Sequence, residues 1–89
     1  MPYIEKSKRK FWMEVGLSEL FLSYICKNTP SGELNYIITK ILLKALGKIP
    51  NYARYNEIIG VLECCKLELY RREISEYEDS KKDLNGDVY

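Results

Sequence analysis

Histidine is absent from this chain of 89 residues, and basic and acidic residues nearly balance, leaving a net charge of +1. The missing imidazole removes the commonest metal ligand, the commonest general base and the usual charge switch near neutral pH. The small net charge provides no general basic field of the kind that drives non-specific nucleic-acid binding. We therefore expect neither a histidine-based active site nor general nucleic-acid binding.

Long apolar runs are missing as well. No stretch reaches the roughly 18 apolar residues that a membrane-spanning helix needs, and the N-terminal residues do not follow the pattern of a signal peptide. These two absences predict a cytoplasmic protein without a membrane partner.

Cysteine occurs only three times, at Cys26, Cys64 and Cys65. Neighbouring residues of a helix point about 100° apart, so Cys64 and Cys65 cannot easily pair with each other. The three thiols make a poor disulfide framework and indicate a reducing compartment. A metal site would need further thiols, so we expect no metal and expect Cys64 and Cys65 to be buried as small apolar residues.

The stretch 52–72 is the strongest helix signal in the chain. Its apolar residues recur at spacings of three and four, and they are Tyr55, Ile58, Ile59, Leu62, Cys65 and Leu69. Gly60, inside this stretch, costs about 1 kcal/mol relative to alanine, which is best explained if another backbone approaches closely there. The pattern predicts a helix of roughly 20 residues with partners on two sides.

Two earlier helices are predicted. The first is preceded by a basic cluster at Lys6, Lys8, Arg9 and Lys10. We interpret this cluster as the solvated start of the helix, and phosphate binding is the alternative. The helix runs from Phe11 to about Lys27 on the apolar pattern Phe11, Val15, Ser18, Leu22 and Ile25, and its aromatic residues Trp12, Phe21 and Tyr24 could form an interface. The second spans 31–46, begins at a Thr29 or Ser31 cap and ends at Gly47. Its apolar stripe is Leu34, Ile37, Ile38, Ile41, Leu42 and Ala45.

These elements predict one all-α domain over residues 1–89, a three-helix bundle or helical hairpin with a charged C-terminal extension. Residues 82–89 could form a flexible tail, because Asn85 and Gly86 signal a turn. A chain of this size buries only about 60–65% of its unfolded surface, and the first helix carries excess apolar surface. We therefore expect a homodimer or a higher homo-oligomer.

Five motifs spread over the chain carry a resemblance to a known family. They are GELNY at 32–36, NEIIGVLEC at 56–64, KLELYRR at 66–72, YED at 77–79 and NGDVY at 85–89, with PY near the start. The chain resembles functionally uncharacterised proteins of about 90 residues encoded by tailed phages and their bacterial hosts. The resemblance implies a phage or prophage setting in the bacterial host cytoplasm and no known catalytic residue. Similar sequences tend to have a proline before YED, whereas Ser75 and Glu76 stand here, so a helix is expected to continue to Lys82.

Three groups of polar residues are candidate sites. The first group lies on faces where the second and third helices could meet, and it consists of Asn35, Asn56 and Glu63. These residues could form a hydrogen-bonded network that fixes helix register, or they could form a ligand pocket. A third alternative is that Glu63 is simply exposed. The second group could bind a nucleotide or form a protein-binding hot spot, and it consists of Tyr70, Arg71, Arg72 and Tyr77. The alternative is that the arginines pair with nearby carboxylates such as Glu68. Glu73 and Glu76 have the spacing of a Mg²⁺-binding pair, but no clear second pair accompanies them.

The leading functional hypothesis is a non-enzymatic binder without a cofactor. It would act stoichiometrically for a phage against a host antiviral defence, by masking a host defence protein or by sequestering a signalling nucleotide. The alternatives are a structural or adaptor module and a metal-dependent nucleotide phosphohydrolase.

Overall fold

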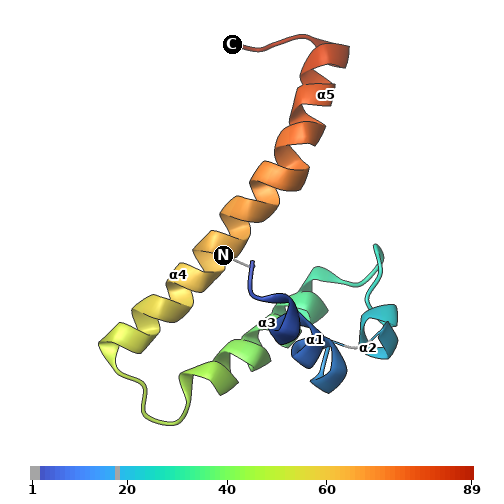
Figure 1. The fold of residues 1–89 in the computed structure, drawn as a ribbon. Helices are drawn as coiled ribbons and strands as arrows, with labels where there is room; N and C mark the ends of the chain where they lie inside the picture. The colour runs from blue at the N-terminus through green and yellow to red at the C-terminus, as the bar shows by residue number, and fades with distance from the viewer. Residues whose placement is uncertain (1–2, 18) are drawn as a thin grey trace. The chain divides into compact units, whose positions relative to one another are not determined.

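The computed structural model describes residues 3–17 and 19–89, and its secondary-structure elements are all helices (Figure 1). The elements are α1 (Lys6–Val15), α2 (Glu19–Ser23), α3 (Ser31–Leu46), α4 (Tyr52–Leu69), the π-helix η1 (Tyr70–Ile74) and α5 (Ser75–Asn85). At 76% helix and without a strand in the described residues, the structure confirms the predicted all-α class.

The chain divides into two compact units. Residues 2–51 hold α1, α2 and α3, and residues 52–89 hold α4, η1 and α5. Among the described residues, no helix is long and apolar enough to cross a membrane. The single domain and the bundle arrangement stay predictions.

The first predicted helix is wrong in its extent, because it is two shorter helices. α1 already begins at Lys6, so the basic cluster is the exposed start of a helix as predicted. It ends at Val15, where the N–H groups of Gly16 and Leu17 both donate to the Trp12 carbonyl. Glycine favours such an end because it loses more conformational freedom in a helix than any other residue. Ser18, part of the predicted apolar pattern, lies outside the described residues.

The predicted bounds of α3 are confirmed, but its predicted cap is wrong. Pro30 occupies the cap position, and no side chain caps the helix. Thr29 instead folds back on Cys26: its Oγ1 accepts the Cys26 N–H at 2.9 Å and donates to Cys26 Sγ at 3.8 Å. A hydrogen bond from the Asn28 backbone lowers the pKa of the Cys26 thiol, and the hydrogen bond from the Thr29 side chain lowers it further. At the other end the helix stops at Gly47 as predicted, and this glycine has a φ of +77°.

The second unit is one continuous helical rod (Figure 1). α4, η1 and α5 contain 18, 5 and 11 residues and follow each other without a break. At 1.5 Å per residue the rod is about 50 Å long. The predicted continuation to Lys82 is confirmed, and α5 runs on to Asn85 before Gly86 adopts a φ of +90°.

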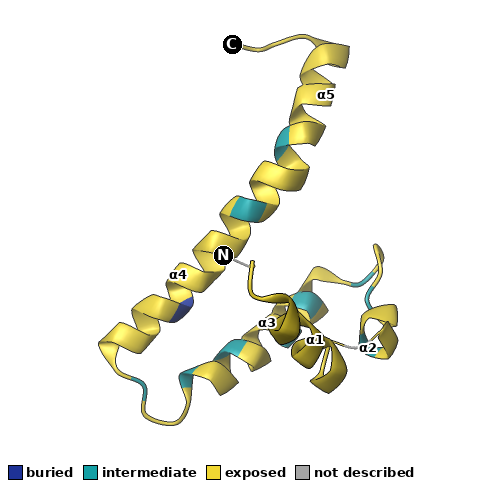
Figure 2. Cartoon of the chain, viewed as in Figure 1, coloured by how far each residue is buried: buried dark blue, intermediate teal, exposed yellow. Residues whose placement is uncertain are grey.

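Most side chains of both units are exposed (Figure 2). Of the described residues only Ile58, at 7% exposure, is buried. Within α3 the predicted stripe is half-buried at Leu34, Ile37 and Leu42, whereas Ile38 and Ile41 are exposed. Many large apolar side chains therefore lie at the surface.

Two packing predictions for α4 are wrong. A Cβ added at Gly60 would meet nothing within 4 Å, so no backbone of its own unit approaches closely there. Cys64 and Cys65 are exposed rather than buried, as is Cys26. Both packing predictions fail for the same reason, because every residue from 59 to 67 is exposed.

The open space at Gly60 predicts that Gly60→Ala stabilises the protein. An alanine loses less backbone entropy on folding, so the free energy of unfolding should rise by about 1 kcal/mol in urea denaturation followed by circular dichroism. Gly47→Ala is the matched control and should destabilise, because φ +77° and ψ −171° are accessible essentially to glycine alone. A loss of stability in Gly60→Ala would mean that a neighbour does contact this position.

Candidate functional site

The candidate site is centred on the π-helix η1, which holds three of the predicted binding residues. Tyr70, Arg71 and Arg72 belong to η1, and Tyr77 follows within α5. The Ser75 N–H donates to the Tyr70 carbonyl five residues earlier, which is the hydrogen bond of a π-helix. Single π turns inside α-helices are frequent at functional sites. The site thus coincides with the one irregular turn of the rod.

The π turn creates a contact between Tyr70 and Glu78. In a regular α-helix, residues eight apart point about 80° away from each other. A π turn closes with one more residue, so it brings Glu78 back to within about 20° of Tyr70. The Tyr70 hydroxyl donates to Glu78 Oε2 at 2.9 Å. The bond and the negative charge of Glu78 raise the pKa of the Tyr70 phenol, because both oppose its ionisation.

The two arginines share one carboxylate. Arg71 Nη2 and Arg72 Nε both donate to Glu68 Oε1, the second over 3.2 Å. Glu68 is the least exposed of the three side chains, so its charge is the best shielded from solvent. The structure thus confirms the predicted pairing with a nearby carboxylate. Both arginines are paired with Glu68, and both guanidinium groups stay accessible.

The ring of Tyr77 is covered by Lys81, whose Nζ lies over it at 5.6 Å from the ring centroid. A cation–π contact at an exposed site contributes about 0.5–1 kcal/mol. Tyr77 is still 62% exposed. Its ring is therefore held in place but remains available to a partner.

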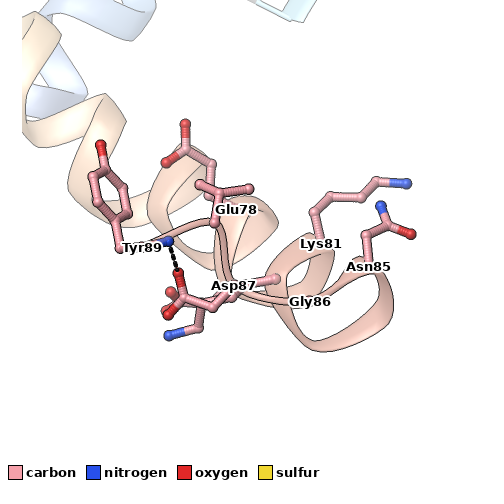
Figure 3. Close-up of a pocket in the computed structure, with 9 residues that line it drawn as sticks. Glu78, Lys81, Asn85, Gly86, Asp87 and Tyr89 are labelled. Carbon is pink, nitrogen blue, oxygen red and sulfur yellow. Dashed lines mark hydrogen bonds between the residues drawn. The ribbon is translucent and has the colours of Figure 1, made fainter.

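Beyond Tyr77 the C-terminal segment and the end of α5 enclose an open pocket of about 370 Å³ (Figure 3). Glu78, which accepts the hydrogen bond from the Tyr70 hydroxyl, also lines this pocket together with Lys81 and Asn85. Asp87 and Tyr89 come from the segment after Gly86, and the Tyr89 N–H donates to Asp87 Oδ1 at 2.8 Å. Sequence reasoning missed Glu78 and this pocket, and the Asn85–Gly86 turn signal was the only hint of them.

The other predicted set, Asn35, Asn56 and Glu63, is not gathered within either unit. Asn35 lies in α3 and accepts a hydrogen bond from Thr39 Oγ1 at 3.3 Å. Asn56 and Glu63 lie in α4, and Glu63 accepts from Lys66 Nζ at 3.3 Å. Glu63 is 54% exposed, so the cost of a buried carboxylate does not arise. A pocket formed by these three residues stays a prediction.

Glu73 and Glu76 are exposed on η1 and α5. In residues 3–17 and 19–89, His, Cys, Asp and Glu side chains nowhere form a group of three or more that could hold a metal ion.

Comparison with known proteins identifies a family. The family model described as "Domain of unknown function (DUF6899)" matches residues 1–88, and the chain belongs to that family. Neither the curated proteins nor the solved structures contain a match.

The Tyr70–Glu78 contact predicts a measurable pH dependence. Because the pKa of Tyr70 is raised in the folded state, the contact stabilises the fold below the ordinary tyrosine pKa and is lost as the pH rises through the raised value. Glu78→Gln should return the Tyr70 pKa toward its ordinary value in an NMR titration of ring-labelled tyrosine. Glu76→Gln, a matched neutralisation two residues away, should leave the Tyr70 titration unchanged. An identical shift in both variants would contradict the contact.

Proposed function

We propose that this member of the DUF6899 family is a non-enzymatic protein that acts by binding a partner in stoichiometric amount. The observation that carries the proposal is the coincidence of the π turn with the exposed Tyr70, Arg71, Arg72 and Tyr77. Tyrosine and arginine are enriched in protein hot spots, where a few residues contribute most of the binding energy.

The local charge supports a protein as the partner. Residues 66–82 contain five basic and five acidic residues, so the surface around η1 is neutral overall. A highly charged anionic ligand would gain little from such a surface, whereas a mixed surface of rings and paired charges is typical of protein interfaces. We propose that the chain masks a surface of its partner.

The setting of the proposal is a phage or prophage, as the shared motifs imply. A host antiviral defence protein in the bacterial cytoplasm is then the partner that a small stoichiometric binder would mask. Self-association is part of the same proposal, supported by the many exposed apolar residues of both units, because a chain with so little buried surface gains stability from partners.

Removing the two rings should break the complex. In bacteria that carry an antiviral defence, the wild-type chain should co-purify with one defence component at a fixed molar ratio and restore phage plating. Tyr70→Ala combined with Tyr77→Ala should weaken binding by roughly tenfold or more, since a hot-spot residue contributes about 2 kcal/mol and 1.4 kcal/mol is tenfold. Tyr52→Ala, which removes an exposed ring at the other end of the same rod, is the control and should bind normally. Equal loss in both variants, or no rescue of plating by the wild type, would contradict the proposal.

A signalling nucleotide is the second candidate partner, favoured by the two accessible guanidinium groups beside tyrosine rings. If this holds, calorimetry with cyclic dinucleotides and ADP-ribose-type ligands should show binding that Arg71→Ala with Arg72→Ala abolishes. Arg54→Ala, on the same rod and paired with Glu57, is the control. Unchanged affinity in the double variant would remove the nucleotide assignment and leave the protein partner.

A further inference from the structure

The first unit carries an apolar groove outside the site described above. Trp12 from α1 and Ile41 and Ala45 from α3 line it, and its volume is about 590 Å³. Lys40 and Lys44, one turn apart on α3, complete the lining. Trp12 is 54% exposed, so a large aromatic face lies open in the groove. An apolar floor with two lysines is a surface for an apolar segment that carries negative charge.

The two units have opposite charge. Residues 1–51 contain eight basic and four acidic residues, whereas residues 52–89 contain six basic and nine acidic ones. In a chain of nearly zero net charge, this division makes one half the electrostatic complement of the other.

Helix α5 has the features that the groove would accept. Tyr77 and Leu84, seven residues apart, lie on one side of the helix and are 62% and 75% exposed. Glu76 and Asp83 each precede one of them and therefore form an acidic row about 100° to one side, while Lys81, which lies over the Tyr77 ring, flanks them on the other side. In the described part of the chain, neither Glu76 nor Asp83 has an ion-pair partner, and the same holds for Lys44.

We infer that the Trp12–Ile41–Ala45 groove of one copy of this chain binds α5 of a second copy, with Tyr77 and Leu84 on the apolar floor and Glu76 and Asp83 beside Lys40 and Lys44. This inference rests on the self-association proposed above and names its surfaces. Because Tyr77 belongs both to this contact and to the proposed partner site, the dimer contact and the bound partner exclude each other. A two-fold dimer of this kind contains the contact twice, because each copy has one groove and one α5. Two such contacts are needed, because a stable interface buries about 1,200–2,000 Å² in total.

Complementary charge reversal tests the inference on the full-length chain. Lys40→Glu with Lys44→Glu reverses the groove, and Glu76→Lys with Asp83→Lys reverses the helix. Each variant alone should raise the dissociation constant of the dimer by about tenfold or more in sedimentation equilibrium. An equimolar mixture should recover both contacts, one with the native charges and one with both charges reversed, and native mass spectrometry should show a dimer that contains one copy of each. Lys27→Glu with Lys48→Glu changes the charge of the same unit equally outside the groove and should dimerise like the wild type.

The outcomes separate the inference from the proposal beneath it. A wild-type chain that is strictly monomeric at tens of micromolar overturns both the self-association and the groove assignment. A dimer that survives both reversals, or a mixture that fails to form the mixed dimer, overturns the groove assignment alone. If Lys27→Glu with Lys48→Glu dissociates as well, net charge rather than the groove controls assembly, and the assignment fails. Unchanged helical circular dichroism in each variant shows that the loss is not unfolding.

Discussion

The scarcity of buried apolar surface is the constraint on which the rest of this structure depends. The chain is 46% hydrophobic, yet Ile58 is the one buried side chain among the residues described. Burying a single leucine or isoleucine stabilises a fold by about 1.5–3 kcal/mol, and helices of this length are marginal in water without such packing. The helices therefore supply apolar surface that other molecules can cover, and binding would add directly to the stability of the folded chain.

The second organising feature is the π turn within the rod. One extra residue in that turn rotates α5 relative to α4, and this rotation places Glu78 rather than Tyr77 beside Tyr70. The same region holds the Glu68 carboxylate between two arginines. A neutral, aromatic and irregular surface of this kind suits recognition of a partner better than electrostatic capture of a strong anion.

Local features of the fold were predictable from the sequence to a good extent. The bounds of α3, its end at Gly47 and the continuation of the last helix to Lys82 were all predicted correctly, because each depends on residues within one or two turns. The break after Val15 was missed, since the apolar pattern continues across Gly16. The cysteines and Gly60 were misplaced for another reason: their surroundings depend on what packs against α4, and periodicity does not specify that.

The sequence by itself determined that the chain is helical, where α3 begins and ends, and that tyrosines and arginines cluster near position 70, because spacing and local backbone preference act over a few residues. Only the tertiary structure decided that Tyr70 bonds to Glu78 and that Trp12 and Ile41 line one groove. Those contacts depend on a change of helical register and on the approach of α1 to α3, and both are set by three-dimensional packing rather than by any local pattern.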